Sequence, residues 1–63
     1  MTTDFGKQIK HKLIEMDRPQ TWLIERVREQ TGLYFDSAYL QKIMTGKTET
    51  PGMVAAIRSI LHI

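Results

Sequence analysis

The sequence predicts a single all-α domain, a compact bundle of four to five short helices. Apolar residues recur every three or four positions through four stretches of the chain, the spacing of one buried helix face. No stretch alternates apolar and polar residues as a half-buried strand does. The four stretches are separated by turn-forming residues: Pro19, Gly32, Gly46 and Pro51-Gly52. Because 63 residues can enclose only one core, we expect one domain over residues 1–63.

The first two helices are expected on either side of Pro19. Asp4 is a candidate N-cap for the first helix. Its apolar face comprises Phe5, Ile9, Leu13 and Met16. Pro19 suits the first turn of the second helix, where its missing N–H would have no partner, and Gly32 suits the end. The apolar face of this second helix comprises Leu23, Ile24 and Val27.

The third helix is expected over about residues 36–45, with Asp36 as its N-cap and Gly46 as its stop. At helical spacing, one side is apolar and comprises Tyr39, Leu40, Ile43 and Met44. The opposite side carries small and polar residues: Ser37, Ala38, Gln41, Lys42 and Thr45.

The fourth helix is expected to begin with Thr50 as cap and Pro51 as its first residue, and to continue to the C-terminus. Its apolar stripe comprises Val54, Ile57, Ile60 and Leu61.

The composition argues against an enzyme. There is no cysteine, so disulfides, thiolate nucleophiles and Cys-ligated zinc are excluded. His11 and His62 lie at opposite ends of the chain, without the spacing of a metal or hydrolytic site. We therefore expect no catalytic activity, no metal, no cofactor and no small-molecule ligand.

The charge and hydropathy pattern fits a cytoplasmic protein. No apolar run is long enough for a membrane span, and the charged N-terminal stretch does not resemble a secretory signal. A net charge of +2 permits binding to DNA without favouring it.

The second and third helices together have the features of a helix-turn-helix. A recognition helix must be fixed by an apolar underside and must present small or hydrogen-bonding side chains to base edges. The predicted third helix meets both requirements, with Ser37, Ala38, Gln41 and Lys42 outward and Tyr39 at the edge of the core or in contact with DNA.

Over nearly its whole length the chain resembles the Xre/Cro-type helix-turn-helix regulators of bacteriophages and mobile elements. The matching features are Phe5-Gly6 in the first helix, Gln20-Thr21-Trp22-Leu23 opening the second, and Thr45-Gly46-Lys47 followed by Pro51 after the third. The chain departs from the family by a longer segment between the second and third helices, Arg28 to Phe35.

This resemblance implies a lambda-repressor-like domain that binds a double-stranded DNA operator, most often as a repressor. It implies that Gln20 meets a phosphate, that Ser37, Ala38 and Lys42 face bases, and that Lys47 and Thr48 contact the backbone beyond. The phosphate roles are also reasonable physically, because helix N-termini and lysines attract phosphates.

Two alternatives use the same scaffold. A helical protein-binding module would grip its partner through Trp22 and the segment Leu33-Tyr34-Phe35, and an antitoxin component would bind DNA together with a toxin chain. Trp22 is otherwise expected to be covered by residues 33–35 or by the stem of Arg26.

The apolar C-terminus suggests a weak homodimer that buries Ile63 and supplies the second half-site. The alternative is that Ile63 folds back onto the first helix.

Overall fold

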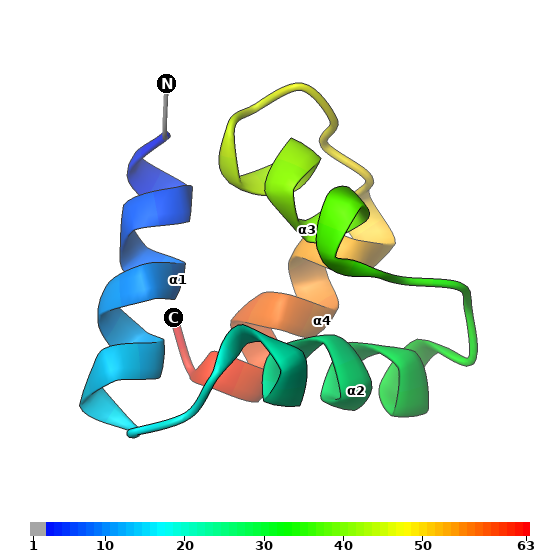
Figure 1. Cartoon of the computed structure of the whole chain (residues 1–63). Coiled ribbons are helices and arrows are strands. Elements are labelled where there is room, and N and C mark those ends of the chain that lie inside the picture. Colours follow the sequence, from blue (N-terminus) through cyan, green and yellow to red (C-terminus); the bar gives the residue numbers. More distant parts are fainter. Residues whose placement is uncertain (1–2) are drawn as a thin grey trace.

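The computed structural model describes residues 3–63 and contains four α-helices within them (Figure 1). The helices are α1 (Asp4–Glu15), α2 (Gln20–Thr31), α3 (Ser37–Met44) and α4 (Pro51–Leu61). No strand occurs among these residues. The predicted all-α bundle is therefore confirmed, with a helix count inside the predicted range.

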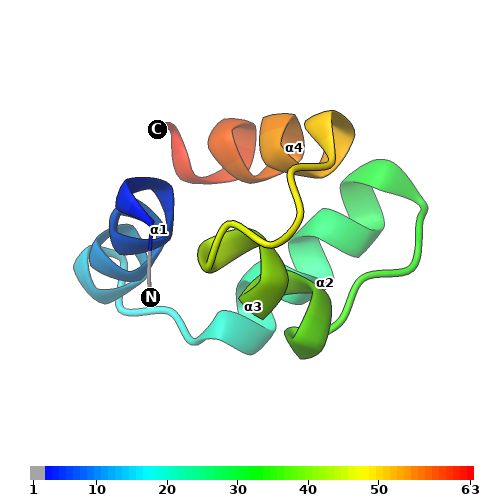
Figure 2. The same cartoon turned by 90° about the horizontal axis from the view of Figure 1, so that it is seen from above.

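The helices form a bundle in which α4 packs chiefly along α2, while α3 packs against both α1 and α2. Seen from above, α3 and the first turn of α2 lie on one side of the molecule and α4 lies on the opposite side (Figure 2). One broad surface of α3 is thus left without a covering helix.

The core is formed by the apolar faces that the periodicity predicts, joined by one residue from a turn. Phe35, in the connection between α2 and α3, is only 1% exposed. In α4 the buried set also includes Met53 and Ala56, whereas Val54 and Ile60 are only half-buried. The fully enclosed apolar side chains are Phe35, Ile9, Leu23, Leu40, Met44, Ile57, Leu61 and Val27.

Two predicted helix starts are wrong by one residue. Thr3, and not Asp4, caps α1, because its hydroxyl accepts a hydrogen bond from the Gly6 N–H at 3.0 Å. Pro19 is the extended N-cap of α2 and does not belong to its first turn. Because the proline ring allows both backbone conformations, the sequence could not distinguish the two placements.

The predicted starts of α3 and α4 are confirmed. Asp36 caps α3 and accepts a hydrogen bond from the Tyr39 N–H at 2.8 Å. Thr50 precedes Pro51 as N-cap of α4, but its hydroxyl makes no capping bond. It is hydrogen-bonded instead to the Tyr39 hydroxyl, at 2.7 Å.

The first turn of α1 is fastened to the end of α3 through Thr3. The Thr3 N–H and hydroxyl both donate to the Met44 carbonyl, each at 3.0 Å. Gly46 passes directly beside this contact with a φ of 82°, and a Cβ there would lie 2.9 Å from the Thr3 methyl carbon. Glycine is thus required at position 46 for two reasons, its left-handed backbone and the nearby Thr3.

Gly46→Ala is predicted to destabilise the fold more than Gly32→Ala. Both positions have positive φ, so alanine costs about 1–2 kcal/mol at each. Only at Gly46 does the new methyl group meet a neighbour, because nothing lies within 4 Å of a Cβ at Gly32. Urea denaturation of the two variants measures the difference.

The second variant that tests this contact is Gly46→Ala combined with Thr3→Ser, which removes the Thr3 methyl group and keeps its hydroxyl. The double variant should recover part of the lost stability. Equal free energies of unfolding for Gly46→Ala and Gly32→Ala would contradict the close contact.

Candidate nucleic-acid interface

The outward side of α3 is exposed to solvent at each of its four predicted positions: Ser37, Ala38, Gln41 and Lys42. The opposite side of the helix is fixed in the core by Leu40, Ile43 and Met44, which are at most 3% exposed. The predicted division of this helix into buried and exposed sides is confirmed. Each predicted base-facing residue therefore lies on one solvent-facing surface.

Two hydroxyl groups near this surface are already engaged. The Thr45 hydroxyl donates to the Gln41 carbonyl at 3.0 Å, with a longer bond to the Lys42 carbonyl. The Tyr39 hydroxyl pairs with Thr50, and the Tyr39 ring packs against Phe35 with centroids 5.0 Å apart. Tyr39 is therefore half-buried at the edge of the core, one of the two positions that its sequence pattern allowed.

Three polar side chains on α3 have no such engagement. Within residues 3–63, the Ser37 hydroxyl, the Gln41 amide and the Lys42 ammonium make no side-chain hydrogen bond or ion pair. They can bond an external partner without breaking a contact of the fold.

The N-terminus of α2 lies on the same side of the molecule as α3 (Figure 2). Its N-cap, Pro19, offers no side-chain cap, and its first turn has no acidic residue. Within residues 3–63 the N–H groups of Gln20 and Thr21 make no hydrogen bond, whereas the Trp22 N–H donates to the Pro19 carbonyl. Exposed Gln20 thus stands at a helix start whose partial positive charge favours an anion.

The loop after α3 folds back on that helix. The N–H groups of Lys47 and Thr48 both donate to the Lys42 carbonyl, at 2.9 and 3.3 Å. Lys47 is exposed, whereas Thr48 is half-buried.

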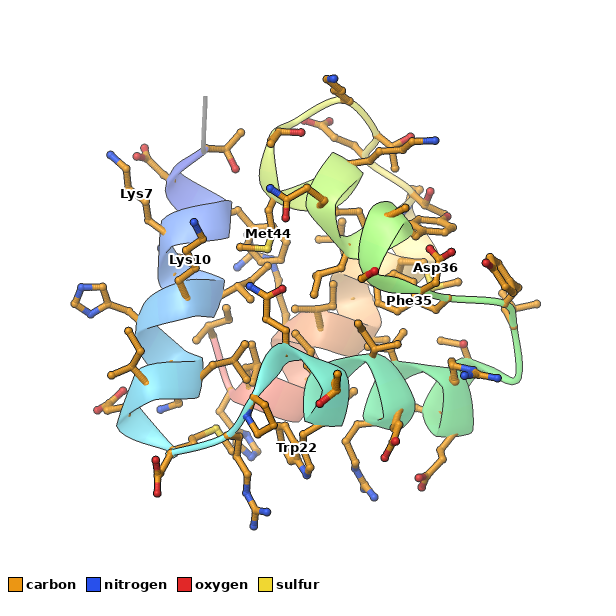
Figure 3. All side chains as sticks on the ribbon, viewed as in Figure 1. Lys7, Lys10, Trp22, Phe35, Asp36 and Met44 are labelled. Carbon is orange, nitrogen blue, oxygen red and sulfur yellow. The ribbon has the colours of Figure 1, made fainter. Side chains whose placement is uncertain are left out.

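Two further lysines lie on α1, whose start is tied to the end of α3 by the Thr3 bonds. In Figure 3 Lys10 lies over the ribbon of α1, whereas Lys7 projects from the side of α1 that is turned away from α3. Both are exposed, and neither forms an ion pair among the described residues. The only sequence signal was their spacing on the polar side of α1.

The start of α3 is reinforced electrostatically. The Tyr34 hydroxyl donates to the Asp36 carboxylate, which also accepts the Tyr39 N–H. These bonds lower the pKa of Asp36, the Tyr34 hydroxyl being the larger cause. The same bond to Asp36 raises the pKa of Tyr34. The Asp36 carboxylate at the start of α3 is therefore occupied by partners inside the fold.

Trp22 is half-buried and packs against the core. The Arg18 guanidinium lies 5.4 Å from the centre of its ring, a cation–π contact. Arg18 therefore covers one face of the ring, a contact that the sequence did not predict. In Figure 3 the Trp22 side chain lies below α2 while α3 lies above this helix.

Ile63 is also half-buried. Its N–H donates to the Arg58 carbonyl, and it shares a groove with side chains of α1, among them His11 and Lys12. Its carbonyl accepts from the Arg58 guanidinium, which stacks 4.5 Å from the Phe5 ring centre. The structure therefore matches the alternative in which the C-terminus folds back onto the first helix.

Three large apolar or aromatic side chains are strongly exposed. Leu33 and Tyr34, in the connection between α2 and α3, are 60% and 72% exposed, and Ile14 on α1 is 78% exposed. The residues of the longer segment predicted between the second and third helices thus lie in three different places. Residues 28–31 belong to α2, Phe35 lies in the core, and Leu33 and Tyr34 face solvent.

Across the described residues, no group of three His, Cys, Asp or Glu side chains is placed to hold a metal ion. Within the same part of the chain, every helix is too short or too polar to cross a membrane.

The paired groups Tyr34 and Asp36 predict a pH dependence of stability. A lowered pKa of Asp36 contributes stability above its ordinary pKa of about 4, and this is lost as the pH falls through the lowered value. A raised pKa of Tyr34 contributes stability below its ordinary pKa of about 10, and this is lost as the pH rises through the raised value.

Urea midpoints measured across the acid range test this dependence. Asp36→Asn keeps a capping side chain but no titrating carboxyl, so its midpoint should fall less on acidification than that of the wild type. Tyr34→Phe should show a reduced acid loss and no alkaline loss from this position. An unchanged acid profile in Asp36→Asn would contradict the assignment.

No protein-family model, no curated protein and no solved structure matches the chain in the comparisons made. Function is therefore inferred from the side chains around α3.

Proposed function

We propose that this protein binds double-stranded DNA in a sequence-specific manner and acts as a transcriptional regulator, with α3 in the major groove. The observation that carries the proposal is the division of α3 into one buried and one exposed side. Its apolar side is locked in the core, while Ser37, Gln41 and Lys42 point outward with unbonded polar groups.

The size of the surface suits this role. The major groove of B-DNA is about 12 Å wide and admits one α-helix. The side of the molecule formed by α3 and the first turn of α2 has no helix in front of it (Figure 2). Small side chains at Ser37 and Ala38 would let the start of α3 approach base edges closely.

The groups around α3 can bind the phosphates on either side of the groove. Gln20 and the first N–H groups of α2 supply donors, and Lys47 supplies a charge beyond the end of α3. Lys10 adds another charge from α1. This local concentration of cations compensates for the small net charge of the whole chain, +2.

The mechanism we propose is occupancy of an operator. The bound domain would repress by excluding polymerase or a competing protein from the site. Paired half-sites would require a weak homodimer. Such a role places the protein in the cytoplasm, with the DNA that it regulates.

Salt dependence tests DNA binding directly. With about four phosphate contacts per protomer, the affinity for a mixed-sequence duplex should fall with a log–log slope near −3.5. Fluorescence anisotropy between about 50 mM and 200 mM salt measures this slope. Lys47→Ala should reduce it by about one.

Arg26→Ala is the matched control, since it removes the same charge from another surface. Arg26 is exposed, lies one helical turn after Trp22 on α2, and pairs with Glu29 at 3.2 Å. Its slope should equal that of the wild type. A wild-type affinity that does not change with salt concentration, or no binding to any duplex, would refute the proposed function.

A protein-binding role is the second candidate, because Leu33 and Tyr34 form an exposed apolar pair. The same pair could serve a homodimer, which Ile63 serves less readily now that it packs on α1. In sedimentation equilibrium at high protein concentration, Leu33→Asp should then weaken self-association.

The control for that experiment is Ile14→Asp, which places the same charge on the most exposed apolar side chain of α1. It should leave the association constant unchanged. Equal association constants for Leu33→Asp and the wild type would remove residues 33 and 34 from the interface.

A further inference from the structure

The free hydrogen-bonding groups on the outward side of α3 indicate which base pairs this helix would recognise. The hydroxyls of Thr45 and Tyr39 are already bonded within the fold, so they do not compete for base edges. Asp36 can also be set aside, because its carboxylate serves the Tyr39 N–H and the Tyr34 hydroxyl. A carboxylate reader of cytosine is thereby removed.

The groups that remain differ in what they recognise. The Gln41 amide offers one donor and one acceptor side by side, which matches the N7 acceptor and N6 donor of adenine. The Lys42 ammonium offers donors only, which matches the O6 and N7 acceptors of guanine. Ser37 has a hydroxyl that serves either partner, so it adds little discrimination.

The spacing of these residues fixes the length of the sequence read. From Ser37 to Lys42 the helix advances about 7.5 Å, at 1.5 Å per residue. Base pairs are stacked about 3.4 Å apart, so this distance spans about two steps. Gln41 and Lys42 are adjacent in the chain and both exposed, and therefore reach neighbouring or nearly neighbouring pairs.

We infer that α3 selects duplex DNA containing an adenine–thymine pair, read by Gln41, and a guanine–cytosine pair, read by Lys42, within about three successive base pairs. Ala38, one turn before Lys42, leaves room for a thymine methyl group at the same element. The inference rests on the proposed DNA binding and adds to it the identity of the bases.

The experiment starts with selection of binding sites from random-sequence duplexes by the full chain. The selected element should contain both base pairs at the stated spacing. Anisotropy is then measured on the selected duplex and on two variants, one with the adenine pair replaced and one with the guanine pair replaced. Each replacement should weaken wild-type binding about 10-fold or more.

Single substitutions assign each pair to its reader. Lys42→Ala should bind the selected duplex and the guanine-replaced duplex equally, while it still discriminates at the adenine pair. Gln41→Ala should show the opposite pattern. Gln41→Lys should change the preference at its pair from adenine to guanine, a gain that a misfolded variant could not produce.

Thr45→Ala, at the C-cap of α3, is the matched control, because its hydroxyl is turned to the carbonyls of α3. It should leave both preferences unchanged. If Lys42→Ala weakens all duplexes equally, Lys42 contacts a phosphate and the inference is overturned. It is also overturned if the selection returns no base preference although binding remains salt-dependent, and in that case the proposed DNA binding stands.

Discussion

The burial of three side chains, Leu40, Ile43 and Met44, is the interaction on which the candidate site depends. A helix of eight residues is too short to be stable alone in water, so α3 exists because its apolar side is packed. Each of these side chains contributes about 1.5–3 kcal/mol on burial. The same burial fixes which residues face outward, because a rotation of the helix would expose the core.

Hydrogen bonds at both ends of α3 complete this fixation. Asp36 holds the first turn, and Thr3 holds the last carbonyl, from Met44, while it also caps α1. The position of α3 is therefore coupled to the start of α1 through one short side chain. Gly46 allows the chain to leave the helix beside Thr3 without a clash.

The sequence predicted those features that follow from local periodicity and from capping chemistry. The four helices, the stripe of Leu23, Ile24 and Val27, and the cap at Asp36 all rest on neighbours in the chain. The contact between Thr3 and Met44 joins residues 41 positions apart, so no local pattern could reveal it. The hydrogen bond between the Tyr39 and Thr50 hydroxyls could not be predicted for the same reason. The sequence therefore did not show that Thr50 makes no capping bond on α4.

The candidate site was predictable as a surface but not in its chemical detail. Amphipathicity alone indicated that Gln41 and Lys42 face solvent. It gave no information on which hydroxyls are consumed inside the fold, as that of Thr45 is. That distinction depends on rotamers and on packing between helices, and it reduces the polar face of α3 to a few side chains able to bind an outside partner.

The connection between α2 and α3 shows how a longer segment can still present α3 outward. Gly32 ends α2 in the left-handed conformation, at a φ of 69°, so the chain turns sharply instead of continuing along the helix axis. Phe35 then anchors the far end of the connection in the core, and Tyr34 bonds Asp36 directly before α3 begins. The turn is thus fixed at both ends, and the extra length is absorbed by the last turn of α2 and by the exposed Leu33. The direction of α3 depends on these anchors and not on the number of residues between the helices.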